Sequence, residues 1–359
     1  MAEKNQQHNP IGAAVSRLGK GSKRGLIGLL GLAAVAAAYG LYWTNLADQV
    51  RVGIEQWAAE RRAEGYEVAY AGLDVAGFPF RLEATMAAPA LSRPQAARPW
   101  SWRGPTLVMS ARPWRLSRVR FSAPGQHRIT GGPAGRTGAI VLEAGALGLE
   151  LRFRDGKPAG AILKARDVVM KDKAGVGIAT LAAADITVDR PQGKTVSAVD
   201  LSANVETIQY GREPVPGLGR TTERLDLEAS VTGGLPEGLG AEALSQWRDR
   251  GGTVEIRRLD VRHGPLDVEG DGTLALDGDM QPMGAFTFLV RGFLEALDRL
   301  GEAGVIEEGP ARLAKTVLGM LARKHGGDGG ELKVPLSIQE RWLYVGPVAL
   351  GRMPVLRWD

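Results

Sequence analysis

The feature that most constrains this chain is a run of apolar residues near its N-terminus. Residues 25–43 read GLIGLLGLAAVAAAYGLYW and contain no charged side chain. A helix rises about 1.5 Å per residue, so this run spans about 28 Å, close to the ~30 Å hydrocarbon core of a bilayer. We therefore predict a membrane-spanning helix. Its main apolar and aromatic positions are Gly25, Leu26, Ile27, Leu29, Leu30, Leu32, Val35, Tyr39, Leu41, Tyr42 and Trp43.

The charges on either side of this run predict its orientation. Basic residues at positions 17, 20, 23 and 24 precede it, whereas Asp48 and Glu55 follow it. The positive-inside rule places residues 1–24 in the cytoplasm as a basic tail, and the bulk of the chain in the periplasm. Tyr39, Tyr42 and Trp43 lie at the exit end, where aromatic rings favour the headgroup level. The expected location is the inner membrane, crossed once.

Two other interpretations of the apolar run remain open. A cleaved signal peptide would use the small residues at positions 36–38. The apolar run continues past them to Trp43, however, and the 24 residues before it are long for the n-region of a signal peptide. Both features favour an uncleaved anchor. A buried helix of a soluble protein would need apolar neighbours on every side.

The remainder of the chain has the composition of a β-rich protein. Glycine is frequent, at 49 of 359 residues, and aromatic residues make up only 6%, which is typical of short strands and tight turns. The chain has no cysteine, which excludes thiol catalysis and thiolate metal sites. A domain outside the cytoplasm would thus have to be stabilised by its own core, without disulfides.

Hydrophobic periodicity divides the chain into four parts. Residues 44–65 predict an amphipathic linker helix, with Leu46, Val50, Ile54 and Trp57 on one face and Gly65 at its end. From residue 66 to the end the period changes to two, which indicates antiparallel strands separated by Gly, Pro and Asp-Gly turns. Helices are expected only at residues 241–250 and as a pair within residues 292–325 (293–300 and 311–324). Strands at residues 331–338 and 342–345 follow this pair.

An uneven distribution of charge marks residues 84–142. This segment holds nine arginines but no Asp, Glu or Lys, although the whole chain has a net charge of only +5. Trp100, Trp102 and Trp114 lie within it. Pairing with carboxylates elsewhere in the fold would explain the arginines. A surface facing anionic lipid headgroups is the other interpretation, and beyond the membrane it is favoured over nucleic acid.

No motif assembles an active site, so we expect no catalytic residue, cofactor or metal. The four histidines are far apart, and none of them forms a pair with metal-ligand spacing. The P-loop and dinucleotide fingerprints are incomplete, and there is no G-x-S-x-G elbow. The acidic residues between 267 and 279 resemble part of a calcium loop, but Gly278 occupies the twelfth position, so an exposed strand face with acidic turns explains them.

Two sets of motifs resemble the bacterial family known as domain of unknown function 2125. The first is Gly77, Phe78, Pro79, Phe80 and Arg81, followed by Trp100, Trp102 and Trp114. The second runs from residue 270 to 274 and from 334 to 338. The resemblance implies an envelope protein with an N-terminal anchor and no established activity. The layout also resembles AsmA-type envelope proteins, which implies an extended, curved antiparallel sheet that lines an apolar groove for lipid chains.

The leading hypothesis is a mostly β (α+β) protein anchored in the inner membrane that binds or guides lipid, or supports envelope homeostasis, without catalysis. Membrane lipid is the expected partner, with other envelope proteins as further partners and no nucleic acid. An assembly scaffold for envelope proteins is the alternative, and a glycan hydrolase with an unrecognised site is third. If the Phe78 ring is in the core, Phe78→Ala should cost roughly 3–5 kcal/mol. A small cost combined with lost function would indicate binding.

Overall fold

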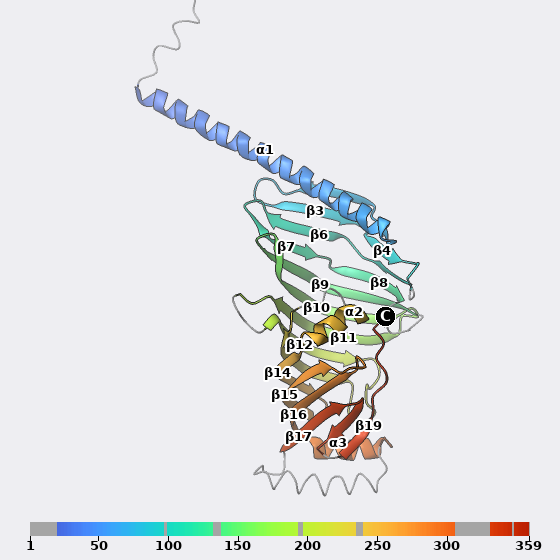
Figure 1. Cartoon of the computed structure of the whole chain (residues 1–359). Coiled ribbons are helices and arrows are strands. Elements are labelled where there is room, and N and C mark those ends of the chain that lie inside the picture. Colours follow the sequence, from blue (N-terminus) through green and yellow to red (C-terminus); the bar gives the residue numbers. More distant parts are fainter. Residues whose placement is uncertain are drawn as a thin grey trace, which may run out of the picture.

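The computed structural model describes residues 20–96, 99–131, 138–192, 197–234, 240–305, 331–346 and 348–358. These residues form one curved antiparallel sheet of 19 strands and three helices (Figure 1). This architecture confirms the predicted fold class: mostly β, with an apolar N-terminal helix and a few short helices. The predicted helix at residues 311–324 lies outside the described residues.

Helix α1, Lys20–Ala63, joins the predicted anchor and the predicted linker helix into one unbroken helix. It leans away from the edge of the sheet, and its N-terminal half projects beyond the domain (Figure 1). Its C-terminal half packs on the sheet through Trp43, Ala47, Leu46 and Val50. Trp57, which we predicted on this face, is 44% exposed, and the neighbouring Ala58 is buried instead.

From β9 onward the sheet is a meander in which each strand pairs with its neighbours along the chain. The first eight strands are short: β1 Glu67–Ala69, β2 Gly72–Ala76, β3 Leu82–Ala87, β4 Ala90–Arg93, β5 Trp100–Arg103, β6 Leu107–Arg112, β7 Arg115–Ser122 and β8 Gly125–Gly131. They form two branches, β2-β3-β6-β7 and β1-β4-β5-β8, which both pair with β9.

Strand β9 and those after it continue the sheet in chain order. Their bounds are β9 Ala139–Arg154, β10 Lys157–Asp172, β11 Gly177–Asp189, β12 Ser197–Tyr210, β13 Thr221–Thr232, β14 Val254–His263, β15 Leu266–Leu276, β16 Pro282–Arg291, β17 Glu331–Gln339, β18 Trp342–Val345 and β19 Val348–Arg352.

A line of irregular residues crosses the sheet between the two branches. Pro89, Gly104 and Pro124 interrupt the paired strands of the branches, and Gly145 is left unpaired between the two halves of β9. The line continues through Asp167 (φ 51°) and Thr207 (φ 46°), which are skipped in the pairing of β10 and β12. Such breaks in the ladder free the strands locally from the hydrogen-bonding pattern, so that they can bend there. The aligned irregularities thus help to curve the sheet.

One face of the sheet, here called the inner face, is apolar from end to end. The register connects a row of directly paired residues that are all apolar or glycine: Val75, Ala84, Met109, Phe121, Leu149, Leu163, Ile186, Ala203, Leu227, Leu259, Gly270, Phe288 and Val334. A second row runs beside it from β7 to β18: Val119, Leu151, Ala161, Val188, Leu201, Ala229, Ile256, Gly272, Phe286, Leu336 and Val345.

The opposite, outer face carries the charged side chains. Neighbouring strands are connected there by ion pairs, among them Arg120–Glu150, Arg152–Asp189, Arg166–Asp185, Arg224–Asp260, Arg262–Asp267 and Arg291–Glu331. Most of these pairs are exposed, and exposed pairs contribute about 0–1 kcal/mol each. Their main effect is to keep this face in water and so to orient the sheet.

Two short helices lie at opposite ends of the strands, α2 at the C-terminal end of β13 and α3 at the C-terminal end of β16. Helix α3, Phe293–Glu302, follows β16, and its Phe293, Leu294 and Leu297 pack against Leu332 and inner-face neighbours. Helix α2, Ala241–Asp249, lies between β13 and β14, and its Trp247 donates a 2.8 Å hydrogen bond to the Thr232 carbonyl. Both helices were predicted within one or two residues of their bounds.

The first prediction concerns a close approach on the inner face. A Cβ added at Gly270 would lie 2.2 Å from Phe288 Cδ1 and 2.6 Å from the Thr287 carbonyl oxygen. Because a backbone atom cannot rotate away, Gly270→Ala should lower the free energy of unfolding by about 1–3 kcal/mol. Gly278→Ala is the matched control, since no atom lies within 4 Å of its added Cβ. Equal melting temperatures for the two variants would contradict this packing.

The second prediction concerns Asp260, which is 0% exposed on the outer face. Burial opposes ionisation of this carboxyl, but hydrogen bonds from Arg224 (2.9 Å to each oxygen) and Arg258 (3.1 Å) outweigh it and hold the Asp260 pKa below its usual value. Asp260→Asn should therefore lower the free energy of unfolding by about 2 kcal/mol at neutral pH, because two partly exposed arginines lose their partner.

The pH dependence gives a separate check on Asp260. A carboxyl with a lowered pKa contributes stability above its unfolded pKa of about 3.9, and this contribution is lost as the pH falls through the folded pKa. The difference in stability between the wild type and Asp260→Asn should thus shrink below about pH 4. A difference that stays constant from neutral pH into that range would contradict the assignment.

Candidate functional site

Three side chains of α1 hold two turns of the sheet beside the exit end of the apolar run. The Tyr39 hydroxyl donates to the Pro79 carbonyl at 2.5 Å, and the Tyr42 hydroxyl donates to the Pro113 carbonyl at 2.9 Å. Trp43 Nε1 donates to a third carbonyl, that of Arg81, at 2.9 Å. The aromatic residues predicted to lie at the headgroup level therefore also fasten the helix to the domain.

The first of these turns is the β2–β3 connection, residues 77–81. Gly77 has φ 104°, and its carbonyl accepts a 2.9 Å hydrogen bond from the Arg81 N–H, which closes the turn around a cis Phe78–Pro79 bond. An added Cβ at Gly77 would lie 2.9 Å from the Arg81 oxygen, so this position requires glycine. The Phe78 ring meets Trp43 edge-on, with 5.6 Å between ring centroids.

The tips of both turns expose aromatic rings to solvent. Phe78 is 56% exposed, Phe80 71%, and Trp114, in the β6–β7 turn, 59%. Apolar rings of this size are usually at least partly covered in soluble domains. The Phe78 ring is thus outside the core, and the condition for a large stability cost of Phe78→Ala is not met.

The other two motif tryptophans lie elsewhere, in β5. Trp102 Nε1 donates to His127 Nδ1 at 3.3 Å, and His127 Nε2 donates to the Ala123 carbonyl at 2.8 Å, so this buried histidine is satisfied. Trp100 packs edge-on against Tyr66, with centroids 6.3 Å apart. These tryptophans support the sheet, whereas Trp114 is presented to the outside.

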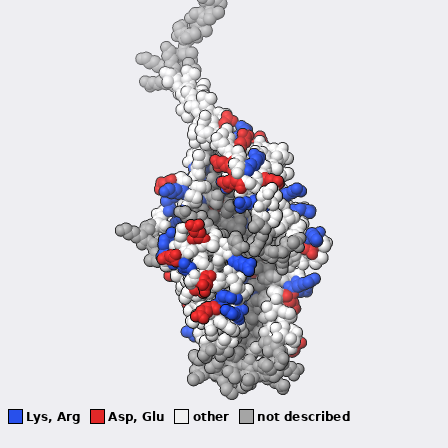
Figure 2. Space-filling model, turned by 45° about the vertical axis from the view of Figure 1, so that its right-hand side comes forward, with Lys and Arg blue, Asp and Glu red and all other residues white. Residues whose placement is uncertain are grey.

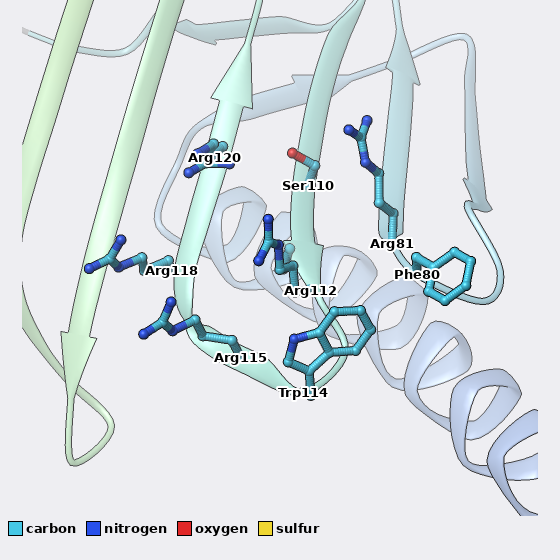
Figure 3. Close-up of a pocket in the computed structure, with 9 residues that line it drawn as sticks. Phe80, Arg81, Ser110, Arg112, Trp114, Arg115, Arg118 and Arg120 are labelled. Atoms are coloured by element: carbon cyan, nitrogen blue, oxygen red, sulfur yellow. The ribbon is translucent and has the colours of Figure 1, made fainter.

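A pocket of about 700 Å³ opens on the outer face between the two turns. Figure 3 shows Phe80 and Trp114 at its rim and the guanidinium groups of Arg81 and of the arginines of β6 and β7 above them. The pocket is lined by five arginines: Arg81, Arg112, Arg115, Arg118 and Arg120. Four of the five come from the acid-free segment that the sequence singled out.

Carboxylates neutralise little of this cluster. Arg120 Nε lies 2.8 Å from Glu150 Oε2. Among the described residues the other four arginines make no ion pair. Pairing with distant carboxylates therefore explains one arginine of the pocket, not the cluster.

The inner face is only partly covered by the helices. On β12, Leu201, Ala203 and Val205 are half-buried, while the intervening Ser202 and Asn204 are exposed on the outer side. Burial on this strand is therefore one-sided. Within the described ranges, no group of three or more His, Asp or Glu side chains is placed to hold a metal ion.

Comparison with known proteins gives one match. The profile of the family described as "Uncharacterized protein conserved in bacteria (DUF2125)" covers residues 43–354. The chain belongs to this family. No curated protein and no solved structure matches it, so the likeness to AsmA-type proteins remains a prediction. Family membership and the apolar helix, which is long enough to cross a membrane, are compatible with a membrane-anchored protein of the envelope.

Sequence reasoning singled out the anchor residues, the motif at residues 77–81 and Trp114, but it did not predict that the structure brings them together. It missed the outer-face cluster as a site, although the absence of acids in residues 84–142 was its signal. It also missed Arg81 as a member, because this residue precedes that segment. The two apolar rows of the inner face arise from pairing between strands. The sequence of a single strand does not reveal which residues it pairs with.

The third prediction separates packing from exposure at the joint between helix and sheet. Trp43 is 8% exposed, so Trp43→Ala should lower the free energy of unfolding by about 3–5 kcal/mol. Phe78→Ala removes a ring that is mostly in solvent and should cost about 1 kcal/mol or less. Thermal unfolding of the full chain in detergent measures both. A larger loss for Phe78→Ala than for Trp43→Ala would contradict the joint described above.

Proposed function

We propose that this protein is a single-pass inner-membrane protein whose domain lies on the periplasmic side and binds the acyl chains of lipids along its inner face, without catalysis. The observation that carries this proposal is the unbroken apolar surface of a sheet that stays open. The charges that flank α1 support the orientation.

The joint between α1 and the sheet supports an uncleaved anchor. Cleavage after residues 36–38 would leave Tyr39, Tyr42 and Trp43 on the protein. It would, however, cut the helix directly before these three residues, which bind Pro79, Pro113 and Arg81. The helix continues without interruption to Ala63. Figure 2 shows the projecting part of the helix as an uncharged, white column above a domain covered with both charges.

The dimensions of the inner face suit lipid chains. Adjacent strands are about 4.8 Å apart, so the apolar row from β2 to β17 extends on the order of 50 Å along the sheet. This length exceeds the ~30 Å hydrocarbon core of a bilayer. A sheet face this apolar needs a cover. Helices α1 and α3 cover its two ends, and we assign the stretch between them to acyl chains.

The proposal of a non-catalytic role follows from where the polar groups lie. The ion-paired arginines and carboxylates are on the outer face, connected to each other in pairs. The described part of the inner face offers apolar side chains and glycine in both rows. Such a surface can hold and guide a hydrophobic chain, but it supplies no general acid, base or nucleophile.

The fourth prediction uses photo-crosslinking in intact cells at neighbouring positions on opposite faces. A benzophenone amino acid replaces Leu201 or Leu227 on the inner face and, in matched controls, Ser202 or Glu228 on the outer face of the same strands. Irradiation should attach phospholipid at the inner positions, because only these contact the bound chains. Mass spectrometry of the purified protein detects the adduct.

The same experiment separates lipid binding from the scaffold alternative. Absence of a lipid adduct at both inner positions, in variants that melt like the wild type, would contradict acyl-chain binding. A stoichiometric protein adduct on the outer face would instead favour an assembly scaffold.

A further inference from the structure

The arginine pocket of the outer face is not explained by acyl-chain binding. It lies on the opposite side of the sheet from the apolar rows, since Ser110 and Arg120 pair across β6 and β7 between inner-face residues. Its arginines are grouped around an open hollow rather than spread along the sheet (Figure 3). Five positive charges with one carboxylate partner among the described residues form a local field that attracts anions.

The position of the pocket relative to the anchor identifies the anion. The rim residues Phe80 and Trp114 belong to the two turns whose carbonyls are bound by Tyr39 and Tyr42. These tyrosines are at the end of the uncharged run. A bilayer crossed by that run therefore has its headgroup layer at the level of the two turns.

We propose that the two turns and the pocket dock onto the membrane surface and bind the phosphate groups of anionic phospholipids. Phe78, Phe80 and Trp114 enter the interfacial region. The guanidinium groups of Arg81, Arg112, Arg115 and Arg118 bind the lipid phosphates above it. Docking orients the sheet on the bilayer and brings its first strands to the lipids.

The chemistry of the side chains agrees with a lipid phosphate. Arginine has a planar group with several N–H donors, which matches phosphate oxygens in a bidentate way. Tryptophan and phenylalanine at the rim favour the boundary between headgroups and acyl chains. A nucleic acid or an acidic protein would satisfy the arginines, but neither explains rings that are 71% and 59% exposed beside a membrane anchor.

This inference uses the membrane anchor of the proposed function but does not depend on acyl-chain binding. The two can fail separately. Crosslinking at Leu201 tests the inner face, whereas docking is measured by the distance of the outer face from the headgroups.

The test uses the full chain, which has no cysteine and thus accepts a single label. Leu116→Cys places the label on β7 beside the pocket, at a residue that is 43% exposed. The labelled protein is reconstituted into vesicles of phosphatidylcholine, with or without about one third phosphatidylglycerol, that carry a headgroup quencher. Docking should give stronger quenching of the fluorophore in the anionic vesicles, and high salt should abolish the difference.

Two triple variants with the same loss of charge complete the test. The label on Arg112→Gln/Arg115→Gln/Arg118→Gln should be quenched equally in both kinds of vesicle. This variant lacks three basic groups, which near an anionic surface strengthen the attraction by about two orders of magnitude. Arg212→Gln/Arg220→Gln/Arg357→Gln removes three exposed arginines far along the chain and should behave like the wild type.

Thermal unfolding shows whether each variant is folded, and among the described residues Arg112, Arg115 and Arg118 make no ion pair whose loss would destabilise the sheet. Equal quenching of the wild type in neutral and anionic vesicles would overturn the proposal. So would an anionic preference that the pocket variant retains. Neither outcome bears on whether the inner face binds acyl chains.

Discussion

The register of the backbone hydrogen bonds is the constraint on which the rest of this structure depends. Side chains alternate between the two faces of a strand, so a shift of one residue would place charges among the apolar rows. Ion pairs on the outer face, such as Arg166–Asp185 at 2.6 Å, and apolar pairs on the inner face specify the same register. The pairing stays in register on both sides of the irregular residues Asp167 and Thr207, so the two faces stay intact.

Much of the architecture was accessible from the sequence because its signals are local. The uncharged run, the period-two pattern and the helix at residues 293–300 each depend on residues that are close in the chain. The helix face was less accessible: Trp57 fits the apolar spacing, yet it is 44% exposed and the neighbouring Ala58 is fully buried. An alanine can lie closer to a backbone than a tryptophan can, and hydrophobic spacing alone does not predict which of the two residues is buried.

The candidate site was predicted only as far as its signals are local in the chain. Residues 77–81 and Trp114 were singled out as a motif, but the sequence could not distinguish Trp114, in solvent, from Trp102, which donates to His127. That difference arises because Trp114 occupies a turn and Trp102 occupies the interior of a strand. The arginines meet because β3, β6 and β7 are adjacent, which follows from pairing over a distance in the chain.

The meander has a consequence for how this chain becomes folded. Each strand after β9 needs only the strand made just before it, so its partner is already present when it is synthesised. Proteins whose contacts are close in sequence fold quickly, so their strand edges stay unpaired for a short time only. From β9 onward the sheet can therefore grow in the order of translation, and at this end only its newest strand offers a free edge to other chains.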